Sequence, residues 1–91
     1  MNETDTMLQM HFNLTDRQVN LLTDQQKDIL FYIFCYGSIT PMEAFSELGI
    51  TKLATRISEM KVLGIQFDQT YESRVNRVGR NVRYMRYRKA A

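Results

Sequence analysis

The stretch "GSITPMEAFSELGITKLATRISEMKVLG", residues 37–64, decides the fold. Thr40 followed by Pro41, with Glu43 three positions after the threonine, is typical of a helix N-terminus. The threonine and glutamate side chains of such a capping box satisfy backbone N–H groups that have no partner inside the helix, and proline at the first helical position lacks an N–H anyway. Gly49 predicts that this helix ends after about two turns.

A second helix is expected to start directly afterwards, with Thr51 as its cap, and to end at Gly64. Residues 49–51 would then be the only connection between the two helices. Two short helices joined by a tight glycine turn form a helix-turn-helix, which holds its second helix out from the body of the domain. The polar face of that second helix is expected to carry Lys52, Thr55, Arg56 and Glu59.

Upstream, Thr23 and Gln26 form another capping pair, and they predict a helix from Asp24 to about Tyr36. The segment Ile29–Tyr36 is apolar on nearly all sides. Such a helix is either buried on several sides or forms a subunit contact, so a homodimer through this segment is one expectation.

The first residues of the chain are harder to interpret. Residues 1–13 show no clear hydrophobic period, and we expect a loosely ordered arm there. Thr15 with Gln18 predicts a short helix after it. The expected division is an N-terminal arm with a possible short helix at residues 1–21 and a folded domain at residues 22–91.

After residue 64 the period changes from helical to alternating. "IQFDQTYES" at residues 65–73 and "NVRYMRYR" at residues 81–88 predict two strands, and "NRVG" between them predicts a turn. The expected result is a β-hairpin with its tip near Asn76–Arg80. The face that the second strand turns to the core is left open between two pairs, Val82 with Tyr84 or Met85 with Tyr87.

The hairpin carries an arginine at every third position from Arg74 to Arg86. In a helix this spacing would form a stripe, but in a strand residues three apart point to opposite faces. The strand arms must therefore divide their arginines between a ligand and the fold. A tip rich in arginine, residues 74–80, is the clearest candidate for ligand binding.

Composition and charge limit the possible functions. A chain of 91 residues with 44% hydrophobic content supports one small domain without a large enclosed cavity. Residues 1–50 hold two basic and seven acidic residues, whereas residues 51–91 hold ten and three. This polarised charge predicts that the C-terminal half faces a polyanion.

Other classes of protein are disfavoured by what the sequence contains. Cys35 is the single cysteine and His11 the single histidine, so we expect no internal disulfide, metal site, cofactor or catalytic residue, and no enzymatic activity. The longest apolar run is too short to span a bilayer, and the N-terminus has no secretory signal pattern. The expected location is the cytoplasm, without membrane contact.

Taken together, the elements predict an α+β fold of the winged helix-turn-helix type, with a three-helix core, a C-terminal two-stranded β-hairpin wing and an extra N-terminal arm. The amino-acid sequence of residues 37–88 also resembles that of the small helix-turn-helix domains encoded by bacteriophages and prophages. The likeness covers roughly Leu22–Arg88. Its most specific part is the run of Ile39, Thr40, Pro41, Glu43, Ala44, Leu48, Gly49, Ile50, Leu53, Ala54, Arg56 and Ile57.

The resemblance implies a phage-encoded protein that binds double-stranded DNA, as a transcriptional regulator, in a bacterial host cell. It implies that the third helix enters the major groove and that the wing lies on the backbone or in the minor groove. The implied DNA-binding residues are Thr51, Lys52, Thr55, Arg56 and Glu59 on the helix and Arg74, Arg77, Arg80 and Arg83 on the wing. For Arg56, base readout and pairing with an acid inside the fold remain equal alternatives.

Two further functions remain open. A phage protein of this fold could instead bind and inhibit a host polymerase, nuclease or defence complex, with the host protein as partner. The acidic half of the chain would supply that surface, through Asp16, Asp24, Asp28, Glu43 and Glu47. Stacking of tyrosines on single-stranded bases is the second alternative, and it would use Tyr71, Tyr84 and Tyr87.

Overall fold

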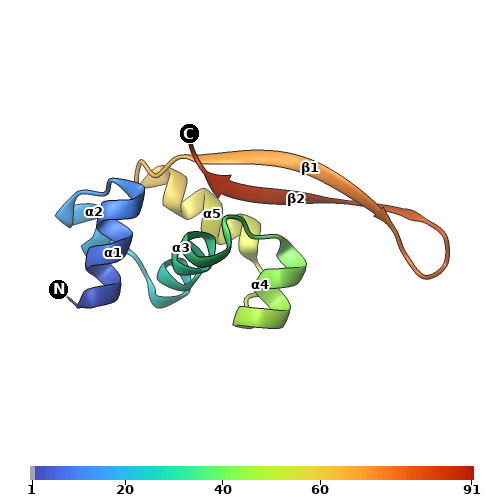
Figure 1. The fold of residues 1–91 in the computed structure, drawn as a ribbon, viewed down its shortest axis with the longest axis horizontal. Coiled ribbons are helices and arrows are strands. Elements are labelled where there is room, and N and C mark those ends of the chain that lie inside the picture. Colours follow the sequence, from blue (N-terminus) through green and yellow to red (C-terminus); the bar gives the residue numbers. More distant parts are fainter. Residues whose placement is uncertain (1) are drawn as a thin grey trace.

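The computed structural model describes residues 2–91, in which five helices are followed by a two-stranded antiparallel hairpin (Figure 1). The predicted α+β winged helix-turn-helix fold is confirmed. The helices lie together at one end of the molecule, and the hairpin extends well beyond them. The elements are α1 (Glu3–Phe12), α2 (Asp16–Leu21), α3 (Asp24–Tyr36), α4 (Pro41–Leu48), α5 (Leu53–Val62), β1 (Phe67–Val75) and β2 (Asn81–Lys89).

The expectation of a loosely ordered arm is wrong for Glu3–Phe12, because these residues form helix α1. The Asn2 side chain caps this helix by accepting a hydrogen bond from the backbone N–H of Asp5 at 2.8 Å. Leu8 is fully buried in the same core cluster as the residues of α3 and α5. A helix with a single fully buried side chain leaves no periodic stripe in the sequence, which is why it was missed. Met1 of the expected arm lies outside the described residues.

The capping pairs predicted for α2 and α3 are confirmed, since both form complete capping boxes. Helix α3 buries Ile29, Leu30 and Ile33, whereas Phe31 and Tyr36 on its other side are exposed. The predicted burial of this helix on several sides therefore holds for one side only. The other side faces solvent in the single chain.

The turn of the helix-turn-helix is longer than expected. Gly49 adopts a positive φ of 69°, and its N–H closes the end of α4 as predicted. Ile50 follows and is buried, which anchors the turn in the core. Thr51 is not the cap of α5, because the helix begins at Leu53 and its N-cap is Lys52, without a side-chain cap hydrogen bond.

The wing is fastened at its base and free at its tip. Its strands pair from Phe67 opposite Lys89 to Val75 opposite Asn81. Backbone hydrogen bonds of 2.9 Å in both directions join Ile39 to Tyr87, so the segment before α4 lies along β2. Of the two residue pairs that could face the core from β2, the structure shows Met85 with Tyr87. Tyr87 is buried and Met85 packs against the core, while Val82 and Tyr84 point to the opposite face.

Among residues 2–91, no helix is long and apolar enough to cross a membrane.

Replacing Leu8 with Ala should destabilise the protein by about 2–4 kcal/mol, because a fully buried leucine leaves a cavity when it is truncated. Urea unfolding followed by circular dichroism measures this directly. Met10→Ala is the matched control on the same helix, since Met10 is 78% exposed and its truncation should change the free energy of unfolding by less than about 0.5 kcal/mol. Equal effects of the two substitutions would show that α1 is not part of the core.

Candidate nucleic-acid interface

The polar face of α5 is presented to solvent because its apolar face is used by the core. Leu53, Ile57 and Met60 are buried at helical spacing. The opposite face therefore points outward, with Thr55 and Glu59 exposed on it, and Thr51 and Lys52 are exposed just before the helix begins. Hydroxyl and ammonium groups at these positions can donate hydrogen bonds to phosphates or base edges.

Arg56, the fifth predicted residue, serves the fold as well. Its Nε forms an ion pair with Glu59 Oε1 at 3.3 Å. This nitrogen is buried and has no hydrogen-bond partner in the described chain. Glu59 Oε1 in turn accepts a hydrogen bond of 3.1 Å from Gln26 Nε2 at the start of α3. The Arg56 side chain keeps 26% of its surface exposed. Both of its expected roles are therefore compatible with the geometry.

The tip of the wing is held in one conformation by its own turn. Asn76 Oδ1 accepts hydrogen bonds from the backbone N–H groups of Val78 at 3.1 Å and Arg80 at 3.0 Å. The backbone of Asn76 also bonds Arg80 at 2.8 Å, and Gly79 provides the positive φ of 82°. These bonds confirm the predicted turn and fix the direction in which the two tip arginines leave the backbone.

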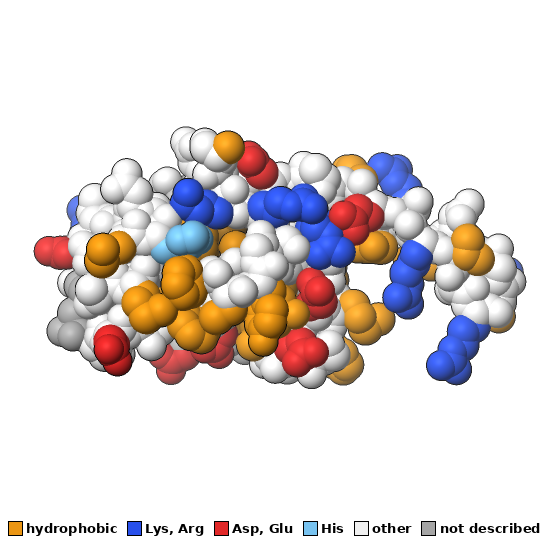
Figure 2. All heavy atoms as spheres, in the orientation of Figure 1, with side chains coloured by type: hydrophobic (Ala, Val, Ile, Leu, Met, Phe, Trp, Pro, Cys, Tyr) orange, Lys and Arg blue, Asp and Glu red, His pale blue; other side chains and the backbone are white. Residues whose placement is uncertain are grey.

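Arg77 and Arg80 project from this tip into solvent. Both are exposed, and within residues 2–91 neither lies within ion-pair distance of an acidic side chain. Figure 2 shows basic side chains at the far end of the wing, away from the acidic groups of the helices. Positive charges without acidic partners on a protruding, hydrogen-bonded turn are well placed to meet phosphates.

The other two predicted wing arginines lie on opposite faces of the hairpin. Arg74 is opposite Val82, and Arg83 is opposite Ser73 one position along the ladder. Arg83 places its guanidinium 4.4 Å from the centre of the Tyr71 ring, in cation–π contact. The structure therefore does not bring all four wing arginines onto one surface.

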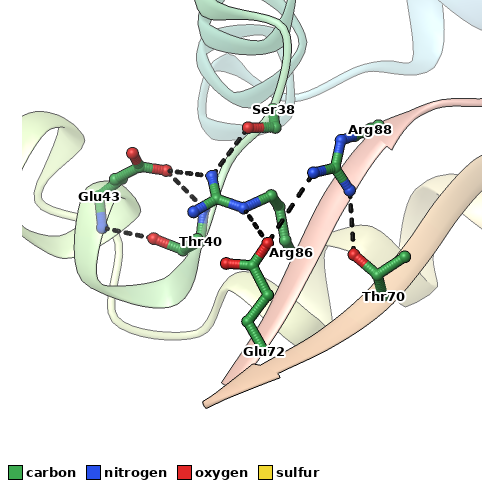
Figure 3. Close-up of polar contacts among 7 residues, drawn as sticks. All are labelled: Ser38, Thr40, Glu43, Thr70, Glu72, Arg86 and Arg88. Atoms are coloured by element: carbon green, nitrogen blue, oxygen red, sulfur yellow. Dashed lines mark hydrogen bonds and ion pairs between the residues drawn. The ribbon is translucent and has the colours of Figure 1, made fainter. Parts of the chain in front are cut away.

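Arg86 is the residue whose role sequence reasoning did not identify. Its guanidinium joins three elements (Figure 3): Nε donates to Glu72 Oε2 at 2.8 Å, Nη1 donates to Ser38 Oγ at 2.9 Å, and Nη1 lies 3.7 Å from Glu43 Oε1. Glu43 also accepts the backbone N–H of Thr40 in the capping box of α4. Arg86 thereby connects the wing to α4, the first helix of the helix-turn-helix, through Glu43, which also belongs to the capping box of that helix.

Arg88 completes this cluster from the solvent side. Its Nη1 donates to Thr70 Oγ1 at 2.9 Å, and its Nη2 lies 3.9 Å from Glu72 Oε2. Glu72 therefore faces two guanidinium groups. The hydrogen bond from Arg86, followed by one from Tyr84, lowers the pKa of Glu72 below its ordinary value of 4.5. The same pair raises the pKa of Arg86.

Replacing Glu72 with Gln should weaken the wing base at neutral pH and remove part of its sensitivity to acid. Because the pKa of Glu72 is lowered in the folded state, its ion pair contributes stability above the unfolded pKa of about 4.5, and this stability is lost as pH falls through the folded pKa. The unfolding temperature, measured from about pH 6 to about pH 3, should fall less in the Glu72→Gln variant than in the wild type.

Asp68→Asn, on the same strand, is the control and should keep the wild-type acid dependence, because Asp68 lies outside the Arg86 cluster. An unchanged acid dependence in Glu72→Gln would argue against a stabilising role for the pair.

Comparison with known proteins shows the family to which the chain belongs. The family model described as "winged helix-turn-helix domain" matches residues 24–89, which is 66 of the 91 residues. No curated protein and no solved structure matches the chain significantly. The matched segment begins with α3 and ends with the last residue of β2, so it contains the helix-turn-helix and the whole wing. On this match the chain belongs to the winged helix-turn-helix domain family, whose fold implies DNA binding.

Proposed function

We propose that the protein is a transcriptional regulator that binds double-stranded DNA with α5 in the major groove and the wing on the backbone or in the minor groove. The observation that carries this proposal is the hydrogen-bonded wing tip, on which Arg77 and Arg80 are exposed and have no acidic partner among residues 2–91. The proposed DNA-binding residues are Thr51, Lys52, Thr55, Arg56, Glu59, Arg74, Arg77, Arg80 and Arg83.

Within this set, the contacts divide by chemistry. Thr55 is exposed on α5 and Lys52 is exposed at its N-cap, and side chains of this length reach base edges or phosphates in a major groove. The arginines at the tip carry positive charge on a narrow turn, and narrow minor grooves attract arginine. Contacts by α5 would supply sequence discrimination, and contacts by the tip would supply affinity.

A phage or prophage origin and a place in the bacterial cytoplasm are part of the same proposal. They are supported by the resemblance of residues 39–57 to phage-encoded domains. The alternative, in which the chain inhibits a host polymerase, nuclease or defence complex, has no support from the comparisons and stays a prediction.

The homodimer expected through Ile29–Tyr36 also stays a prediction. Three apolar residues of that segment are already buried within the chain, which leaves Phe31 and Tyr36 as its exposed rings. Size-exclusion chromatography over about a hundredfold range of concentration decides the question, because a dimer dissociates on dilution. An elution volume independent of concentration at the position of a monomer would rule the dimer out.

Removing both tip arginines, in the double variant Arg77→Ala with Arg80→Ala, should weaken binding to a random-sequence duplex and reduce its dependence on salt. Each lost phosphate contact lowers the slope of log affinity against log salt by about 0.9, so the double variant should lose about 1.8 from the slope. Fluorescence anisotropy of a labelled duplex at several salt concentrations gives both values.

Arg17→Ala is the matched control, since Arg17 is an exposed arginine on α2, far along the chain from the wing. It should leave the slope unchanged. If the wild-type protein shows no salt-dependent affinity for duplex DNA, the proposed function is wrong.

A further inference from the structure

The structure exposes an apolar face that contains none of the proposed DNA-binding residues. It lies over α1, α3 and α4, where Figure 2 shows hydrophobic side chains gathered in a band beside the single histidine. Met10 and Tyr36 are its most exposed large side chains, at 78% and 73%. We call this surface the apolar face, and its principal residues are Met10, His11, Phe31, Phe34, Cys35 and Tyr36.

The apolar face is continuous. The His11 ring packs edge-on against the Phe34 ring with centroids 4.8 Å apart, and Phe34 is 6.1 Å from Phe31. Two hollows include these aromatic rings in their lining. One hollow, of about 320 Å³, is lined by Met7, Met10, His11 and Phe34. The other, of about 240 Å³, is lined by Phe31, Tyr32, Cys35, Tyr36 and Leu48 together with two acids, Asp28 and Glu47.

The helices that carry the apolar face are acidic, although Figure 2 also shows basic side chains along one edge of this face. Helices α1, α3 and α4 hold six acidic residues and a single basic one, Lys27. Lys27 is already engaged, because its Nζ lies 3.1 Å from Asp5 Oδ2. Asp28 and Glu47 line the second hollow directly, beside the aromatic rings. An occupant of this hollow therefore meets apolar surface bordered by carboxylates.

The same negative charge is reflected in the Tyr32 hydroxyl. Burial raises its pKa most, the carboxylates of Glu43 and Glu47 raise it further, and the nearby Arg86 guanidinium opposes this rise.

Charge complementarity selects the kind of partner. A second copy related by a twofold axis would bring the same acids against each other, and like charges across an interface oppose association. A helix with one apolar stripe and flanking lysine or arginine side chains fits both the apolar surface and the carboxylates at its border. Amphipathic helices are known to dock in apolar grooves. We propose that the apolar face docks a basic amphipathic helix of a partner protein, with its apolar stripe on Phe31 and Phe34 and its basic residues at Asp28 and Glu47.

The test uses the full-length protein without DNA, so its outcome is independent of the proposed function. The probe is a fluorescein-labelled peptide of about 14 residues, roughly four helical turns, built only from leucine and lysine at amphipathic spacing. A second peptide carries glutamate at every lysine position. We expect the lysine peptide to raise the anisotropy on titration with the protein, and the glutamate peptide not to bind.

Two pairs of variants locate the site. Asp28→Asn with Glu47→Gln should weaken binding of the lysine peptide about fivefold, because two carboxylates at the rim lose their charge. Met10→Ser with Tyr36→Ser should weaken it at least as much through loss of apolar contact. The matched control, Asp16→Asn with Asp68→Asn, neutralises two exposed acids on α2 and β1 and should leave the affinity within about twofold of wild type.

Amide chemical shifts of the protein should change on peptide binding at α3 and α4. The proposal is overturned if the lysine peptide does not bind, if the glutamate peptide binds as tightly, or if the control pair weakens binding as much as the rim pair. It is also overturned if the free protein self-associates and the Met10→Ser with Tyr36→Ser variant abolishes that association, because a second copy would then be the occupant.

Discussion

The guanidinium of Arg86 is the contact on which the arrangement of this protein depends. A two-stranded hairpin is marginally stable by itself in water, and this one is packed against the core only near its base. Arg86 binds Glu72 on the neighbouring strand, Ser38 before α4 and, at longer range, Glu43 within α4 (Figure 3). Together with the backbone pairing of Ile39 and Tyr87, it fixes the direction of the wing relative to the helix-turn-helix.

This anchoring gives the arginines of the wing different tasks according to their position. Close to the base, Arg86 and Arg88 share the Glu72 carboxylate, and Arg86 also faces Glu43, so part of this positive charge is offset within the fold. Midway, Arg83 rests on the ring of Tyr71. At the tip, Arg77 and Arg80 meet no acid in the described chain, and their backbone is held by Asn76. Positive charge available to a polyanion thus increases from the base of the wing to its tip.

Much of this fold could be predicted from the sequence because its local signals are strong. The capping boxes at Thr15, Thr23 and Thr40 and the turn at Asn76–Arg80 depend on neighbouring residues only, and all of them form. Helix α1 was missed because its burial depends on a single leucine and on packing against distant elements. Thr51 fits the sequence pattern of a cap, but α5 begins at Leu53 and its N-cap is Lys52.

The candidate site was predictable to a similar degree. Exposure of the polar side of α5 follows from the helical spacing of its buried residues, so that part of the interface could be read from the sequence. The role of Arg86 depends on the register that places it diagonally from Glu72 and on the approach of α4, and neither is visible in the order of residues. The apolar face likewise requires three helices to be brought together before its continuity appears.

The measurement that tests the central claim most directly is an NMR titration of the labelled protein with a short duplex of random sequence. If α5 and the wing act as one DNA-binding unit, the largest amide shift changes will appear together at residues 51–59 and 74–80 and will saturate at the same duplex concentration. Shift changes confined to α1 and α3, or changes at the wing and α5 that saturate at different concentrations, would contradict the account.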